Sequence, residues 1–157
     1  MNSMKIQFKK TCNCIKNDQC PLDGKCLTDN LIYKANITCN EPTYIPKNYL
    51  GSAETNFKLR YANHKKTFNY EKYENDTELS KEVWRLKRKG YTPKITWTIH
   101  KKCFPYNFNT KRCHLCLNEA LEIASYTGDD LLNKRSELIA KCRHETKFTL
   151  LRHDSKD

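Results

Sequence analysis

The most constraining feature of the chain is a stretch in which a strand pattern passes directly into a helix pattern. Residues 47–53 predict a strand, and residues 54–68 predict a helix whose one face carries, at helical spacing, Phe57, Tyr61, His64 and Phe68. Arg60 and His64 then stand one turn apart on that helix. A guanidinium is a forked, permanently charged donor, so this pair suits binding of a phosphate. The alternative is an ordinary solvated helix with a boundary histidine.

The remaining elements predict a mixed α/β domain. Strand patterns cover residues 31–39 and 94–103, the second with strict alternation of apolar and polar residues. Residues 78–89 predict an amphipathic basic helix that is capped by Thr77 and ended by Gly90. Residues 112–126 predict a further helix, and residues 136–142 a short one, before a charged tail. At 157 residues, one domain of ordinary size is expected.

The composition favours a polyanionic partner. The chain has 29 Lys and Arg and a net charge of +11, spread over several short basic runs, and such a charge binds phosphates through counterion release. No apolar run approaches the length needed to cross a bilayer, so we expect no membrane association.

Nine cysteines leave an odd count, and the first ten residues lack an apolar signal core, so we expect an intracellular protein with reduced thiols. Two groups have spacings that could hold zinc. The first lies in the polar lead 1–28 and consists of Cys12, Cys14, Cys20 and Cys26. The second and less favoured group consists of Cys113, Cys116, Cys142 and His144. Uncoordinated thiols remain the alternative for both groups, and a buried helical face for the Cys113 pair.

Several motifs in fixed order resemble those of the GIY-YIG nuclease family. The segments Leu31-Ile32-Tyr33 and Tyr49-Leu50-Gly51 match its two strand motifs, and Arg60, Glu119 and Asn133 follow at similar spacing. The chain as a whole looks like the endonuclease tail of reverse transcriptases in Penelope-like and related retroelements. Leu31 stands where the family has glycine, and the Tyr33 to Tyr49 interval is longer than is usual there.

The resemblance implies a fold: a small three-stranded antiparallel sheet flanked by helices, over residues 29–145, between the cysteine-rich lead 1–28 and a tail at 146–157. It also implies roles for single residues. Tyr33 would be the general base, Tyr49 would position water or phosphate, Arg60 would hold the phosphate, and Asn133 would support the site. Glu119 would bind magnesium or manganese, and His64 with Lys58 would assist the phenols.

The resemblance further implies a DNA-nicking endonuclease, nuclear when it acts on DNA and working beside a reverse transcriptase of the same polyprotein. DNA contacts are expected from Lys58, Lys65 and Lys66. The alternative is a module of the same fold that binds nucleic acid, is stabilised by zinc and has lost its chemistry.

Overall fold

A computed structural model describes residues 10–134, 139–141 and 147–149, and these residues form a mixed α/β fold built on a three-stranded antiparallel sheet. Strand β1 (Leu31–Cys39) is central, between β2 (Lys47–Ala53) and β3 (Pro93–Lys102). The predicted bounds of the first two strands are confirmed, and the third begins and ends one residue earlier than predicted.

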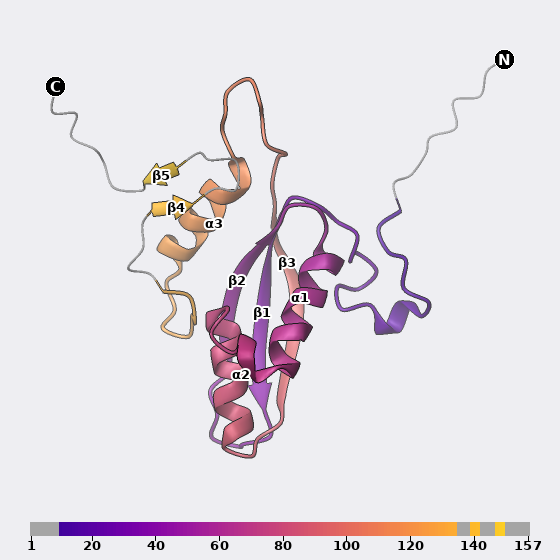
Figure 1. Ribbon diagram of the computed structural model, residues 1–157, viewed down its shortest axis with the longest axis vertical. Helices are drawn as coiled ribbons and strands as arrows, with labels where there is room; N and C mark the ends of the chain where they lie inside the picture. The colour runs from indigo at the N-terminus through magenta and orange to yellow at the C-terminus, as the bar shows by residue number, and fades with distance from the viewer. Residues whose placement is uncertain (1–9, 135–138, 142–146, 150–157) are drawn as a thin grey trace, which may run out of the picture.

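Two helices cover one face of the sheet, whereas a third helix packs at one end beside β2 (Figure 1). Helices α1 (Phe57–Asn69) and α2 (Glu78–Arg88) pack on the face to which Tyr33, Ala35 and Ile37 point. Helix α3 (His114–Ser125) lies beside β2, and its Leu115 joins Ile32 in a second, smaller core on the other face. The alternation of side chains along β1 thus supplies both cores.

Helix α1 begins three residues later than the prediction, because Asn56 is its N-cap. Asn56 is extended, and its Oδ1 accepts a hydrogen bond of 3.0 Å from the Leu59 amide. A short polar side chain at this position satisfies one of the unpaired amides of the first turn and so fixes the helix start. The predicted buried face is confirmed for Phe57 and His64.

Helix α2 has the predicted cap. The Thr77 hydroxyl accepts from the Ser80 amide at 3.0 Å, and Ser80 Oγ accepts from the Thr77 amide at the same distance, which makes a capping box. The helix ends at Arg88, and Gly90 follows with φ +81°. A left-handed residue just past a helix end is where glycine is favoured, as the sequence indicated.

The predicted helix at 136–142 is wrong for the residues that the structure describes. Ile139–Lys141 form strand β4, which pairs in antiparallel fashion with β5 (Lys147–Thr149). This pairing depends on residues several positions further along, so local helical periodicity did not reveal it. The connection between α1 and α2 contains one 3₁₀ turn, Glu71–Tyr73.

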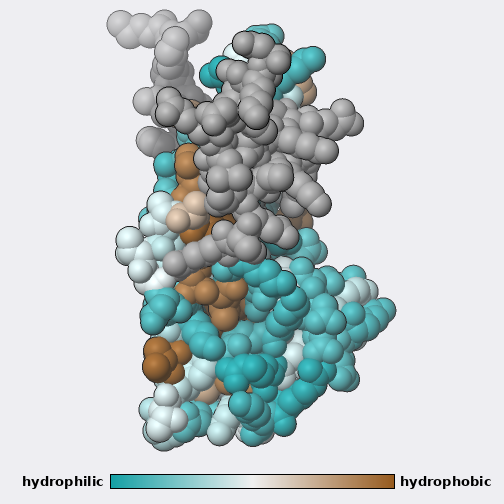
Figure 2. Space-filling model, turned by 90° about the vertical axis from the view of Figure 1, so that its left-hand side faces the viewer, coloured by the Kyte–Doolittle hydropathy of each residue, from teal (hydrophilic) through white to brown (hydrophobic). Residues whose placement is uncertain are grey.

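One face of the molecule is mostly hydrophilic in its lower part, with hydrophobic side chains collected in a band along the middle (Figure 2). None of the helices that the structure describes has the length and apolarity needed to span a membrane.

Substitution Leu86→Ala tests the main core. Leu86 is buried in α2, so the variant should lose about 2–5 kcal/mol of unfolding free energy through lost transfer energy and a residual cavity. Urea unfolding followed by circular dichroism measures the change. Leu59→Ala in α1 is the control, since Leu59 is 56% exposed and the substitution should cost less than about 0.5 kcal/mol.

Candidate functional site

Tyr33 is the centre of the candidate site and is fully buried on β1. Its hydroxyl lies 2.5 Å from His64 Nε2 and receives a 3.2 Å hydrogen bond from Arg60 Nε. Because a guanidinium can only donate, the phenol's own proton is used best by donation to a neutral His64. Arg60 and His64, one turn apart on α1, therefore engage both hydrogen-bonding functions of the Tyr33 hydroxyl. Its oxygen accepts from Arg60, and its proton is donated to His64.

Gly51 makes room for the Tyr33 ring. The two residues are opposite each other in the β1–β2 ladder. A Cβ at position 51 would lie 2.9 Å from Tyr33 Cε2 and closer still to the Cζ and hydroxyl oxygen of the phenol. The space under the ring is therefore available because glycine lacks a side chain, a close approach of the kind that favours glycine inside a strand.

Tyr49 faces the same space from β2. Its ring centroid is 5.9 Å from that of His64, and the Arg60 charge acts on both phenols. Burial raises the pKa of Tyr49 to about 12 and raises that of Tyr33 above its usual range, although Arg60 lowers both. Both tyrosines are thus neutral at physiological pH.

His64 is neutral as well. Burial and, to a smaller extent, the nearby Arg60 charge together lower its pKa to about 3. A neutral imidazole can accept the hydrogen bond of a phenol, but its low pKa makes His64 a weak base in this state of the site. The expectation that His64 assists the phenols by a positive charge does not fit this state of the site.

Glu119 reaches the site from α3. Its Oε2 accepts a 2.6 Å hydrogen bond from Ser52 Oγ on β2, and its charge raises the pKa of both Tyr33 and Tyr49. Ser52 thereby fixes the orientation of the carboxylate. Sequence reasoning missed Ser52, although its place next to Gly51 on a strand end was a usable signal.

Asn133 supports the strand that carries Tyr49. Its amide group makes two hydrogen bonds to the Leu50 backbone, accepting from the Leu50 amide at 2.8 Å and donating to the Leu50 carbonyl at 2.8 Å. The Asn133 amide thus pairs with the edge strand β2 as the backbone of a neighbouring strand would. These contacts act on the backbone of β2, and the supporting role of Asn133 at a metal-bearing site stays a prediction.

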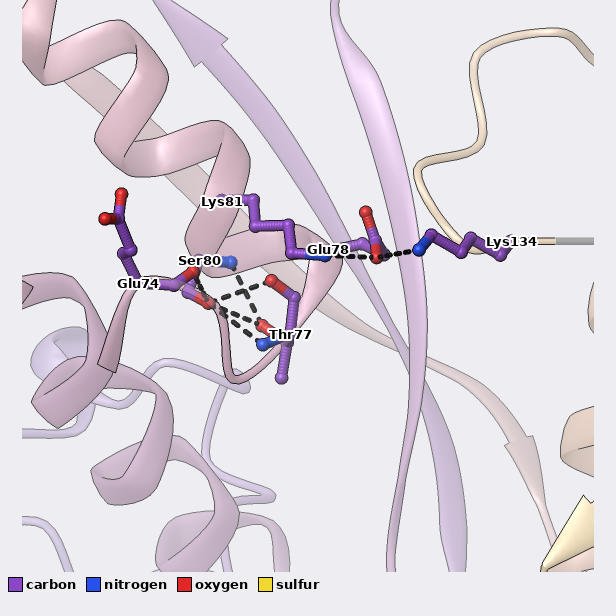
Figure 3. A network of polar contacts seen from close by, with 6 residues as sticks. All are labelled: Glu74, Thr77, Glu78, Ser80, Lys81 and Lys134. Atoms are coloured by element: carbon purple, nitrogen blue, oxygen red, sulfur yellow. Dashed lines mark hydrogen bonds and ion pairs between the residues drawn. The ribbon is translucent and has the colours of Figure 1, made fainter. Parts of the chain in front are cut away.

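The residue after Asn133 ties the same segment to the start of α2 (Figure 3). Glu78 lies between Lys81 and Lys134, with Oε1–Nζ distances of 3.0 and 3.6 Å. Its charge contributes to the raised pKa of Tyr49, so Glu78 lies near the site as well as in the first turn of α2. The Glu78 carboxylate is thus paired with two lysines and lies near Tyr49 at the edge of the candidate site.

A cavity of about 340 Å³ opens beside Arg60 and His64, and Lys66 and Tyr73 line it. Lys66 Nζ is 4.9 Å from the Tyr73 ring centroid. Lys65 and Lys58 point elsewhere: Lys65 Nζ lies 5.5 Å from the Tyr61 centroid, and Lys58 Nζ donates to Asn13 Oδ1 at 2.5 Å. Of the three lysines expected to contact DNA, Lys66 is therefore the one that lines this cavity.

The first predicted cysteine group is assembled. The Sγ atoms of Cys12, Cys14, Cys20 and Cys26 all lie within 4.8 Å of one another, and this group could hold a metal ion. Cys26 Sγ is 3.6 Å from Cys12 Sγ and 3.8 Å from Cys14 Sγ, so the sulfurs are non-bonded thiols rather than disulfides.

The thiols of the cluster differ in their pKa. Burial raises the pKa of Cys26 to about 12, an effect reinforced by the neighbouring thiols. For Cys20 burial acts in the same direction but is outweighed by hydrogen bonds from the backbone of Leu22, Gly24 and Cys26, which bring its pKa to about 6. A thiolate at Cys20 and amide donors around it are the pattern in which thiolate ligands are stabilised.

The second predicted cysteine group cannot be followed to completion, since Cys142 and His144 lie outside the described residues. Cys113 is buried in the smaller core with Cys103 and Ile32, and Cys116 packs against it. Cys113 is the N-cap residue of α3, where it contributes no side-chain cap hydrogen bond.

Comparisons with protein-family models, curated proteins and solved structures found no match to this chain.

The buried neutral His64 predicts a pH dependence of stability. Its pKa is about 3 when folded and 6.5 when exposed, so between these values the unfolded chain binds more protons. The His64 contribution is complete above pH 6.5 and is lost as the pH falls toward 3. Thermal unfolding of wild type and His64→Gln from pH 7.5 to 4 measures it.

The difference in melting temperature between these two proteins should shrink as the pH falls, because protonation of His64 in the unfolded chain removes the contribution that only the wild type has. The carboxylates common to both proteins cancel in this difference. An NMR titration that gave His64 a pKa near 6.5 would contradict this account of the site.

Proposed function

We propose that this protein is a metal-dependent DNA endonuclease of the GIY-YIG type that nicks DNA by phosphodiester hydrolysis. The observation that carries the proposal is the convergence of Tyr33, Tyr49, Arg60 and Glu119 from four separate elements around the Tyr33 phenol. The mixed α/β fold with its three-stranded antiparallel sheet supports it at the level of architecture.

Arg60 is placed to hold the scissile phosphate, since its guanidinium already points at the two phenols. Glu119, oriented by Ser52, would hold a divalent cation. Its carboxylate is the hard oxygen donor that magnesium or manganese prefers. When bound, such a cation polarises the phosphoryl oxygen and stabilises developing charge.

The hydrogen bond between Tyr33 and His64 suggests how Tyr33 acts as a general base. A phenol whose pKa is raised cannot work as a standing phenolate, but it can accept a proton from water while passing its own to His64 at 2.5 Å. Arg60 contributes to the low pKa of His64. A phosphate dianion or diester bound to Arg60 offsets that charge and makes the imidazole a better acceptor.

The surroundings favour DNA as the substrate. A net charge of +11 supplies non-specific attraction to phosphate, and the cavity beside Arg60 is lined by Lys66. The resemblance to Penelope-like elements suggests that the nick primes reverse transcription by a polymerase of the same polyprotein.

We propose zinc as the ion of the four-cysteine cluster. Tetrahedral zinc with Zn–S bonds of about 2.3 Å separates its sulfurs by about 3.8 Å. The separations of Cys26 Sγ from Cys12 Sγ and Cys14 Sγ, 3.6 and 3.8 Å, are close to that spacing.

A second candidate is a catalytically inactive nucleic-acid-binding module of the same fold. It is favoured by the neutral state of Tyr33, Tyr49 and His64 in the absence of substrate. Salt-dependent DNA binding without cleavage in magnesium and manganese would support this candidate over the enzyme.

A plasmid nicking assay with magnesium tests the enzyme. Arg60→Ala and Glu119→Gln should each lower the nicking rate by about 10²-fold or more, the usual effect of losing one charge-stabilising group. DNA affinity, measured separately by fluorescence anisotropy, should change much less for Glu119→Gln.

Glu122→Gln is the matched control, because Glu122 lies on the same helix but contacts His100 and Lys101. It should nick at close to the wild-type rate. Equal activity of Glu119→Gln and wild type would remove the assigned role of Glu119.

A further inference from the structure

We propose that the four-cysteine metal site acts as a brace for the start of α1, so that zinc loading of Cys12, Cys14, Cys20 and Cys26 positions Arg60 and His64. The effect on DNA cleavage rests on the proposed function, whereas the effect on α1 does not.

The amides of the first turn of α1 end on the cysteine segment. The Phe57 amide donates to the Thr28 carbonyl at 3.0 Å, and the Lys58 amide donates to the Cys26 carbonyl at 2.7 Å. These donors have no partner inside a helix and need an outside acceptor. Together with the Asn56 cap on the Leu59 amide, three successive amides are satisfied, one of them by the ligand Cys26 and one by Thr28, two residues further along.

Side chains strengthen the same junction. Lys58 Nζ donates to Asn13 Oδ1, between two of the ligand cysteines. Cys20, Leu22 and Cys26 are buried in the same core cluster as Phe57. The Phe57 ring then packs edge-on against Tyr33, with centroids 5.3 Å apart, so the core is continuous from the cysteine sulfurs to the catalytic phenol.

The cysteine segment has little else to order it. Between residues 10 and 30 its regular structure is one 3₁₀ turn, Asn17–Gln19. Two hydrogen bonds close it on itself, from the Leu27 amide to the Thr11 carbonyl and from Thr11 Oγ1 to the Gly24 carbonyl. A segment this polar orders poorly unless a bound ion offsets the lost chain entropy. Metal occupancy therefore decides whether the acceptors of Phe57 and Lys58 stay in place.

Arg60 and His64 follow the Phe57 and Lys58 amides by two to seven residues. Arg60 holds Tyr33 by a single 3.2 Å hydrogen bond, which a small displacement of the helix would break. The helix end at Asn69 is held separately, since Trp84 Nε1 donates to the Thr67 carbonyl at 2.8 Å. Loss of metal should thus loosen the first turn of α1 while α2 stays folded.

The experiment uses the full chain in three states: as purified, stripped with chelator and dialysed into magnesium alone, and reloaded with Zn²⁺. Hydrogen exchange read by NMR should show faster exchange at Phe57 and Lys58 in the stripped protein, with Leu86 in α2 unchanged. Nicking in magnesium should fall at least 10-fold on stripping and return on reloading.

Loading with Co²⁺ instead gives a second readout of the site. Four thiolates should produce strong sulfur-to-cobalt charge-transfer bands and tetrahedral d–d bands with one equivalent of cobalt. Cys14→Ser should weaken these bands, and Cys39→Ser, a half-buried cysteine of β1 outside the cluster, should leave them intact.

Unchanged exchange at Phe57 and Lys58 on metal removal would overturn the brace, and so would loss of protection throughout α2, which would indicate general unfolding instead. A protein that never nicks DNA while its first-turn amides still respond to zinc would refute the nuclease and leave the brace standing.

Discussion

The hydrogen bond between Tyr33 and His64 joins the central strand to α1, and the rest of the site depends on it. It is buried, so each partner would carry the desolvation cost of an unpaired polar group without the other. Its geometry requires that Gly51 leave room for the phenol and that Phe57 pack beside it. The Tyr33–His64 hydrogen bond therefore requires the strand register, Gly51 and the position of α1 together.

Burial also sets the charge state of the site. The two phenols and the imidazole are all held neutral, while Arg60 keeps its charge because the phenols and Glu119 support it. One persistent cation beside neutral hydrogen-bonding groups is suited to receive an anion. Arrival of a phosphate would offset the Arg60 charge, which lowers the pKa of His64 and of both phenols.

Local pattern was enough to predict much of this fold. The strands 31–39 and 47–53, the α2 cap at Thr77 and the buried face of α1 follow from alternation, helical spacing and capping chemistry within a few residues. The cysteine cluster also follows from spacing. What sequence alone could not supply are contacts between distant positions: Ser52 with Glu119, Asn133 with the Leu50 backbone, and the pairing of β4 with β5. The predicted start of α1 was three residues too early, because Asn56 is the N-cap of the helix.

The two departures from the family motif leave the Tyr33 contact intact. The long interval between Tyr33 and Tyr49 is taken up beyond the site, because the β1–β2 ladder continues from the Tyr33–Gly51 pair to Ile37 and Lys47 before the chain turns. Leu31 pairs with Ala53 and is fully buried in the α1-side core. A leucine here therefore adds apolar contact two residues from the phenol. Since side chains on one face of a strand repeat every second residue, it anchors the same face on which Tyr33 stands.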